Sequence, residues 1–318
     1  MNSAYLYIAA TALLWSGFEA VLKLIAGQFN SIQITFSRIL VGGLILLPLA
    51  VRELKKRTLR PDKALFKALL PMSILGQAIS LTVNQFAVVY APATTVSSIA
   101  TCNPIFIAVF AWILFREKIE QKTIFSLFIA LIGVILIIAP WDLEISFLGI
   151  VLTLLSPIIF SVYSVLIRKP CAKYGGVAVT SICFLLGALE LMLLSALTHI
   201  PFIANLFSSL GMDFLVEIPF FSGYTWETLP YVLYAYVFST GIGFCCYYVA
   251  IEKSSALHAS LAFFLKPVLS PVIAFFLLGE ITSLRALIGG GCMLLALASF
   301  VLPDLLKNHL HNKKQASS

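Results

Sequence analysis

Charged residues are scarce in this sequence. They make up 11% of its 318 residues, whereas 60% are hydrophobic, and the mean hydropathy is +1.02. Soluble domains carry about 25% charged residues, which is enough to cover an apolar core with polar surface. This chain cannot do so, which excludes a soluble globular domain, and we expect its outer surface to face membrane lipid.

Motifs of covalent, metal and nucleotide chemistry are also missing. The six cysteines show no disulfide or zinc spacing, and the sequence has no P-loop, no HExxH and no nucleophile elbow. We therefore expect no metal, no cofactor and no catalysis. The N-terminal segment lacks a basic region and a small-residue cleavage pattern, which favours an uncleaved first membrane span.

What the sequence does contain is a series of apolar runs of about 20 residues, each long enough to cross a bilayer as a helix. Helices are required because lipid offers the backbone no hydrogen-bond partners. The sequence therefore predicts an all-α polytopic membrane protein with ten transmembrane helices. These predicted spans 1 to 10 cover residues 4–27, 31–51, 66–90, 93–115, 123–140, 146–167, 177–199, 228–251, 257–279 and 284–303.

The basic residues predict the orientation of these spans. If the N-terminus is cytoplasmic, 17 of the 21 lysines and arginines lie in cytoplasmic loops or the C-terminal tail, and only Arg285 lies outside. The remaining three, Lys23, Arg38 and Lys266, lie within spans. The net charge of +7 is thus explained by topology, so we expect no nucleic-acid partner. We expect a multi-pass protein of the cell membrane with both termini cytoplasmic.

One phrase occurs twice. "NPIFIAVFAWILFREK" from Asn103 aligns without a gap with "KPVLSPVIAFFLLGEI" from Lys266, so that Pro104 matches Pro267 and Glu117 matches Glu280. A second pair, "ALIGVILII" and "ALIGGGCML", matches span 5 with span 10, and a weaker pair matches span 1 with span 6. Spans 1–5 therefore correspond to spans 6–10.

Because five is an odd number, the second half would enter the membrane in the opposite direction. Such inverted repeats place a binding site near the midplane between the halves. The predicted division is residues 1–140 for the first repeat, 141–306 for the second and 307–318 for a cytoplasmic tail. An insertion at 200–227, without lysine or arginine and rich in aromatics, is expected to lie on the outer membrane interface.

Ten spans in this order, with a proline and a glutamate in spans 4 and 9, resemble the EamA-type transporters of the drug/metabolite transporter superfamily. Trp15, Lys23 and Arg38 also carry the likeness, which covers nearly the whole chain. The resemblance implies carriers of amino acids and other small metabolites, mostly exporters. It further implies a cavity walled by spans 1, 3, 4, 6, 8 and 9.

The twice-written phrase suggests a polar patch at the midplane. A charged residue inside a membrane span is a functional hypothesis by default, and Lys266 lies near the middle of span 9. Its repeat partner Asn103 is also polar, and both precede prolines, Pro104 and Pro267, which remove a helix hydrogen bond and leave a carbonyl free. We expect Lys266, without a counter-ion, to attract an anionic substrate. The alternative is that the prolines only kink the helices for packing.

Glu19 in span 1 allows two interpretations. It lies at a depth similar to that of Arg38 on span 2, so the two could form a structural ion pair. Alternatively, Glu19 contacts substrate or a proton, and Trp15, about one turn away on the same helix face, lines the cavity with it.

Further candidates for substrate binding are polar or aromatic residues in spans 3, 4 and 8. Gln77, Ser80 and Asn84 recur on one face of span 3, Thr101 lies in span 4, and Tyr247 aligns with Asn84 at the 163-residue offset. In membranes such residues also hold helices together, so packing remains an equal alternative.

The resulting functional prediction is a secondary or facilitative carrier that works by alternating access around a midplane cavity. The substrate would be a small molecule, such as an amino acid or a related carboxylate-bearing compound, moved outward. The alternatives are an exporter of drugs or other hydrophobic molecules and, in a different class, a membrane-embedded enzyme or a receptor. The sequence leaves open whether the protein is a monomer or a homodimer.

Overall fold

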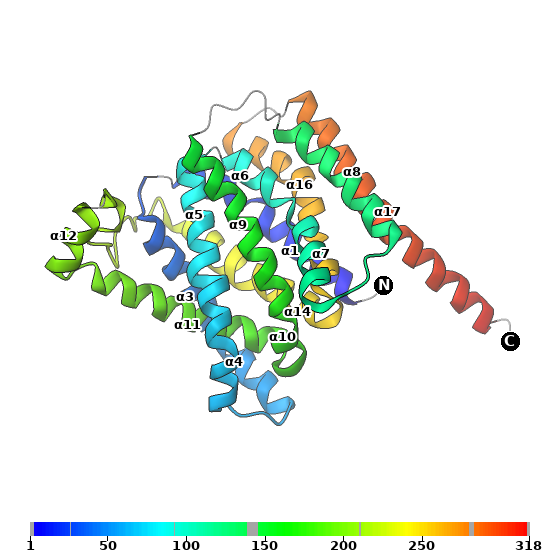
Figure 1. The fold of residues 1–318 in the computed structure, drawn as a ribbon, viewed down its shortest axis with the longest axis horizontal. Helices are drawn as coiled ribbons and strands as arrows, with labels where there is room; N and C mark the ends of the chain where they lie inside the picture. The colour runs from blue at the N-terminus through cyan, green and yellow to red at the C-terminus, as the bar shows by residue number, and fades with distance from the viewer. Residues whose placement is uncertain are drawn as a thin grey trace.

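The protein is built from helices, and a computed structural model describes residues 3–25, 27–91, 93–138, 146–209, 211–279 and 283–316 (Figure 1). Within these ranges there is no β-strand. The elements are α1 (Ser3–Ser16), α2 (Phe18–Leu24), α3 (Ser31–Lys56), α4 (Lys63–Ser73), η1 (Ile74–Ser80), α5 (Leu81–Tyr90), α6 (Ala93–Ala100), α7 (Asn103–Phe115), α8 (Gln121–Ile138), α9 (Phe147–Leu166), α10 (Arg168–Tyr174), α11 (Gly176–Leu197), α12 (Pro201–Ser209), η3 (Asp213–Leu215), α13 (Leu229–Leu233), η4 (Tyr234–Gly243), α14 (Phe244–Lys253), α15 (Ala256–Ala259), α16 (Ala262–Leu278) and α17 (Leu284–Ala316).

By length and composition, nine helical segments of the described residues could cross a membrane. They coincide with nine of the ten predicted spans. The remaining one, span 5, corresponds to the shorter apolar helix Gln121–Ile137. The all-α polytopic class is therefore confirmed, whereas the count of ten stays a prediction.

In two of these segments, a polar side chain just before the apolar run caps the N-terminus of the helix. The Asn30 carboxamide oxygen accepts a hydrogen bond from the backbone N–H of Ile32 at 2.8 Å, which caps α3. The Asp62 carboxylate caps α4 in the same way, at 2.8 Å from the backbone nitrogen of Leu65. Such caps satisfy backbone donors that a helix leaves unpaired at its first turn.

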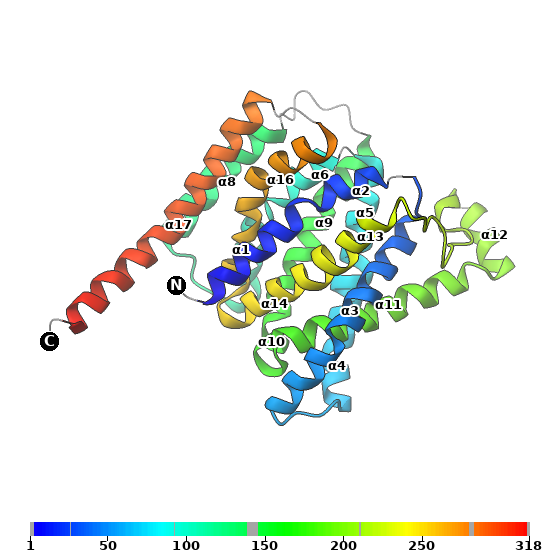
Figure 2. The same cartoon turned by 180° about the vertical axis from the view of Figure 1, so that it is seen from behind.

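Helix packing relates the two halves of the chain. α3 packs on α11, and α8 lies along α17 (Figures 1 and 2), which pairs span 2 with span 7 and span 5 with span 10. The other major contacts come in matching sets: α1 packs on α16 as α9 packs on α7, and α1 packs on α14 as α9 packs on α5. These corresponding contacts fit two repeats, and the repeat itself stays a prediction. The opposite orientation of the halves stays a prediction.

Two π-helical segments also fall at corresponding places, in spans 3 and 8. At the 163-residue offset, η1 coincides with the second part of η4. A π-helix has wider turns than an α-helix, so it rotates the following residues onto a different face, and such segments are frequent at functional sites.

The two prolines of the repeated phrase differ in their local structure. α6 ends at Ala100 and α7 begins at Asn103, so Pro104 lies in the first turn of a new helix, where its missing N–H is not needed. The expectation that Pro104 frees a carbonyl inside a helix is therefore wrong. Pro267 does lie inside α16, as expected.

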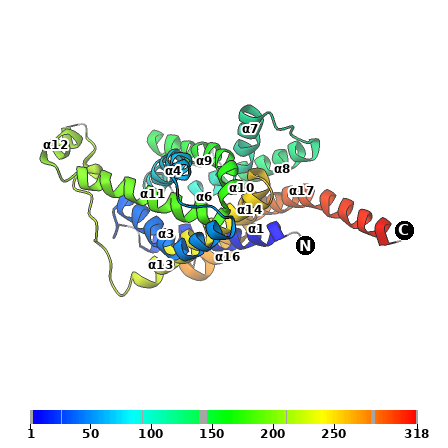
Figure 3. The ribbon, with the colours of Figure 1, turned by 90° about the horizontal axis from the view of Figure 1, so that it is seen from below.

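The insertion at 200–227 and the predicted C-terminal tail add two features. None of the residues of α12 is buried, and α12 projects from the body of the molecule (Figures 1 and 3), while Phe221 and Trp226 in the same insertion are each 88% exposed. α17 continues from span 10 to Ala316, so the backbone of the predicted tail is helical. Glu280 of the repeated phrase lies outside the described residues.

The N-terminus of α11 is held by two carboxylates from neighbouring spans. Glu252 accepts a hydrogen bond from the backbone nitrogen of Gly176 at 2.6 Å, and Glu53 accepts one from Ala178 at 2.9 Å. Arg57 forms ion pairs with both carboxylates. Negative charge at a helix N-terminus is favourable, so this network joins α3, α11 and α14 at one end of the bundle.

A candidate substrate-binding cavity

The segments described above surround a central cavity that is partly open. Side chains from predicted spans 1, 2, 3, 4, 6, 8 and 9 line it, which adds span 2 to the set that the family resemblance implies. The lining residues are Trp15, Phe18, Glu19, Arg38, Ser80, Leu81, Asn84, Ala100, Asn103, Ser156, Pro157, Phe160, Ser239, Phe244, Phe263 and Lys266.

Six of the eight side chains predicted to bind substrate lie in this wall, namely Trp15, Glu19, Ser80, Asn84, Asn103 and Lys266. The other two are elsewhere. Thr101 is buried, and its hydroxyl donates to the carbonyl of Ser98 at 2.5 Å in the turn between α6 and α7. Tyr247 is fully buried, and its hydroxyl donates to Ser164 Oγ at 3.2 Å. Both have structural roles in this conformation.

The charge of Lys266 is balanced. Its Nζ donates to Glu19 Oε1 in an ion pair between α16 and α2, and the two side chains are only 7% and 15% exposed. The prediction that Lys266 lacks a counter-ion is therefore wrong, as is the alternative that Glu19 pairs with Arg38. The tertiary reason is that α16 packs on α1 and α2, which brings Lys266 to Glu19.

Arg38 is the charged side chain of the wall that forms no direct ion pair among the described residues, although Glu19 lies near enough to attract it. It is 2% exposed, and its guanidinium carbon lies 4.9 Å from the centroid of the Phe18 ring. Its Nε and Nη2 are buried without a hydrogen-bond partner among the described residues, where it also forms no ion pair. A buried charged donor without a partner costs about 1–3 kcal/mol or more. The three charged side chains of the cavity wall, Glu19, Arg38 and Lys266, therefore leave one net positive charge.

Glu19 has one free acceptor. Oε1 binds Lys266, whereas Oε2 is buried and has no hydrogen-bond partner among the described residues. The cavity wall thus contains both an anion-binding and a cation-binding group with unmet hydrogen bonds.

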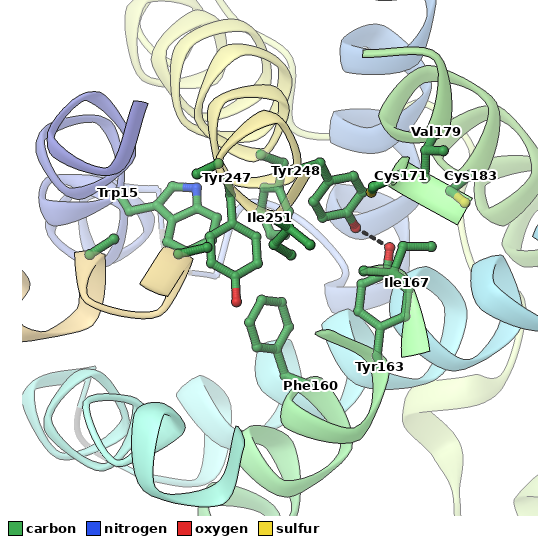
Figure 4. Close-up of a cluster of buried hydrophobic side chains, with 14 of the residues drawn as sticks. Trp15, Phe160, Tyr163, Ile167, Cys171, Val179, Cys183, Tyr247, Tyr248 and Ile251 are labelled. Carbon is green, nitrogen blue, oxygen red and sulfur yellow. Dashed lines mark hydrogen bonds between the residues drawn. The ribbon is translucent and has the colours of Figure 1, made fainter. Parts of the chain in front are cut away.

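The rest of the wall is mainly apolar and includes five aromatic side chains. The Trp15 ring lies 4.7 Å from Phe244 and 5.5 Å from Phe263, between ring centroids, and its Nε1 donates to the carbonyl of Ser239 at 3.1 Å. Tyr247 lies behind this wall and packs against the rings of Trp15 and Phe160 (Figure 4). Trp15 is thus held in place by its hydrogen bond and by neighbouring rings, and this aromatic surface suits an apolar part of a ligand.

Two polar residues of the wall also tie helices together. Asn84 Nδ2 donates to Ser156 Oγ at 3.2 Å, which joins α5 to α9. Ser161 Oγ donates to Asn103 Oδ1 at 3.1 Å, which joins α9 to α7. These two asparagines therefore both line the cavity and hold neighbouring helices together.

Gln77 does not share the cavity-facing side with Ser80 and Asn84. Its Nε2 donates to the hydroxyls of Tyr163 and Tyr248 at 3.0 and 2.9 Å, and the two tyrosines hydrogen-bond to each other (Figure 4). The wide turns of η1 lie between Gln77 and Asn84, so α-helical spacing does not describe their faces.

Sequence reasoning missed Ser156, Ser239 and the aromatic residues Phe160, Phe244 and Phe263. Only Ser156 had a usable signal, because it is a polar residue directly before a proline inside an apolar span, as Asn103 is. No group of three or more histidine, cysteine, aspartate or glutamate side chains of the described residues is placed to hold a metal ion.

Comparison with known proteins assigns the class. The sequence model of the EamA-like transporter family matches residues 2–139 and again residues 147–302, which are close to the two predicted halves. A crystal structure superposes with a TM-score of 0.70 over 94% of this chain and 97% of the other, at 18% identity, which shows a shared fold alone. The protein is therefore a multi-pass helical membrane transporter.

More specifically, the chain belongs to the EamA-like transporter family of the drug/metabolite transporter superfamily. An uncharacterized transporter from Clostridium kluyveri is 30% identical and matches over 99% of this chain and 95% of its own length. The uncharacterized transporter YdfC from Bacillus subtilis is 26% identical, over 91% of this chain and 87% of its own length. The family resemblance noted in the sequence is thereby confirmed.

Proposed function

We propose that the protein is a secondary or facilitative exporter of small carboxylate-bearing metabolites, with amino acids as the first candidates. The observation that supports this is the net positive charge of the three charged side chains, Glu19, Arg38 and Lys266, in the wall of a central cavity formed by both halves of the chain. A substrate carboxylate would neutralise that charge. The two halves would rock against each other around this cavity, which would open to either side of the membrane in turn.

The aromatic wall favours a substrate that is partly apolar, and the same wall would suit drugs or other hydrophobic molecules. Arg38 favours an anionic or zwitterionic compound over a hydrophobic cation, because like charges repel in a medium of low dielectric constant. The sequence has no nucleotide-binding motif, so a gradient of substrate or of an ion would drive transport.

The proposed direction of insertion follows from the distribution of lysine and arginine. Both termini would lie in the cytoplasm of a cell whose plasma membrane contains the protein. Reporter fusions at residues 60 and 318 are expected to read cytoplasmic, and a fusion at residue 213 is expected to read external. Opposite sides for residues 60 and 318 would contradict an even number of spans.

The transport function is tested by filling the cavity. Ser156 lies in its wall, whereas the neighbouring Leu155 is 39% exposed on the outer surface of α9. Metabolites inside and outside cells are compared with and without overexpression, and the compounds that change are then measured in proteoliposomes. We expect Ser156→Trp to abolish their transport and Leu155→Trp to preserve it. If no metabolite moves with the wild-type protein, the proposed function is wrong.

A further inference from the structure

Glu190 is an acidic residue inside a predicted span and away from the central cavity. The other acidic residue inside a span is Glu19, which is paired with Lys266. Glu190 lies in α11, roughly 10 Å before the end of this helix at Leu197. It forms no ion pair among the described residues, and its Oε2 is buried there without a hydrogen-bond partner. Because a bare carboxylate is costly inside a membrane, Glu190 needs another way to lose its charge.

The hydrogen bonds around Glu190 require one more hydrogen than its neighbour supplies. Ser73 Oγ lies 2.6 Å from Glu190 Oε1 and 2.8 Å from the carbonyl oxygen of Leu70. Both are hydrogen-bond distances between oxygens, and a serine hydroxyl has a single hydrogen. If Ser73 donated to a carboxylate, its oxygen would face the Leu70 carbonyl with no hydrogen between them. Both contacts are satisfied if Glu190 is a neutral carboxylic acid whose Oε1–H donates to Ser73.

The surroundings of Glu190 offer no other group to balance a negative charge. The elements that pack on α11 are α3, α4, η1, α10 and α14, and none of their charged side chains interacts with Glu190 among the described residues. The titratable group that does interact with it is Cys183, a buried thiol two turns earlier in α11. A thiol carries no positive charge, so a proton is what can neutralise Glu190.

The contact between Glu190 and Ser73 lies between the two predicted halves. Ser73 ends α4 in the first half, directly before the π-helical segment η1, and η1 leads to Ser80 in the cavity wall. α11 belongs to the second half. One turn before Glu190, the helices meet so closely that a Cβ on Gly187 would lie 2.4 Å from the Cβ of Gln77 in η1. If the halves move apart, this contact breaks.

We propose that Glu190 is a proton-binding site, outside the cavity, that couples the carrier to a proton gradient. In this conformation the acid donates to Ser73. When α4 and η1 separate from α11, Glu190 loses this acceptor and passes the proton from Oε1 to water, which leaves a carboxylate. The contact re-forms only after the carboxylate has taken up a proton again, so the proton favours one conformation over the other. The coupling rests on the proposed carrier function, whereas the protonation of Glu190 in this conformation does not.

Protonation is tested by infrared spectroscopy of the full-length protein at neutral pH, in a maltoside detergent, which has no carbonyl group. The wild type is expected to show the C=O stretching band of a carboxylic acid, and Glu190→Gln should lose that band. Glutamine has the shape of the protonated acid and can donate to Ser73, so the variant should fold, which size-exclusion chromatography checks. Glu227→Gln, at an exposed position of the insertion, is the matched control and should keep the band. A wild type without the band, or an unchanged band in Glu190→Gln, would overturn the site.

Coupling is tested in proteoliposomes with an imposed pH gradient and the membrane potential held at zero. The cargo is a compound that the overexpression comparison identifies. For one proton per cargo molecule, the wild type and Glu227→Gln should concentrate the compound about 10-fold per pH unit, because the two concentration ratios balance. Glu190→Gln should keep downhill transport and lose this accumulation, since it imitates the protonated state permanently.

The coupling is overturned if the wild type ignores the pH gradient or if Glu190→Gln accumulates the compound equally well. It is also overturned if the folded variant loses downhill transport as well, which is what a purely structural role predicts. In each of these cases the carrier function stands. No transport of any metabolite by the wild type would overturn the carrier function and the coupling together, and the infrared band would still decide whether Glu190 holds a proton.

Discussion

Removing the positive partner of the Glu19–Lys266 pair should destabilise the protein strongly. Both side chains are largely buried, at 15% and 7% exposed, so Lys266→Met strands a carboxylate that water does not reach well. Breaking a buried ion pair in this way costs about 3–5 kcal/mol. Reversible unfolding in mixed micelles with increasing sodium dodecyl sulfate measures the free energy of unfolding.

The double variant Glu19→Gln, Lys266→Met should restore most of that loss. Replacing both charges of a buried pair by neutral groups is often neutral or stabilising, so the two single changes must be strongly non-additive. Lys118, an exposed lysine in the loop after α7, is the matched control, and Lys118→Met should change stability by about 0.5 kcal/mol or less. Wild-type stability of Lys266→Met, or additive single and double variants, would refute the ion pair.

Two further predictions concern packing and capping. A Cβ on Gly76 would come within 2.4 Å of the Tyr163 ring, so Gly76→Ala should lower the free energy of unfolding by about 1–3 kcal/mol in the same assay. Gly291→Ala should be neutral or stabilising, because a Cβ there meets nothing within 4 Å among the described residues; equal effects of the two changes would reject this packing argument. Glu252→Gln should lower the free energy of unfolding by about 1–2 kcal/mol, since it weakens the hydrogen bond from Gly176 N–H and removes the ion pair with Arg57. An unchanged free energy of unfolding would show that Glu53 alone is enough to hold the N-terminus of α11.

The spans and the family could be predicted from the sequence because both depend on local composition. A run of about 20 apolar residues in lipid must form a helix, because only a helix satisfies its backbone hydrogen bonds, and this holds independently of the other spans. The repeated motif that starts at Asn103 and at Lys266 likewise records a duplication along the chain, and it led to these two residues of the cavity wall.

The partners of the charged residues could not be predicted, because they depend on how the helices are rotated against one another. Glu19 has Arg38 and Lys266 as possible partners at similar depth, and the packing of α1 and α2 on α16 selects Lys266. That selection reverses the expected roles, since it leaves Arg38 without a direct ion pair among the described residues.

Helix rotation itself is determined by contacts that no single span contains. A Cβ on Gly42 would lie 3.1 Å from the Cα of Gly241, so the backbones of α3 and η4 meet closely there and orient Arg38 one helical turn earlier. The π-helical turns of η1 similarly separate Gln77 from Ser80 and Asn84, because their wider pitch is adopted only when neighbouring helices stabilise it. The sequence by itself thus determined the spans, the repeat pattern and six of the sixteen residues of the cavity wall, and the tertiary packing decided which charged groups pair with each other.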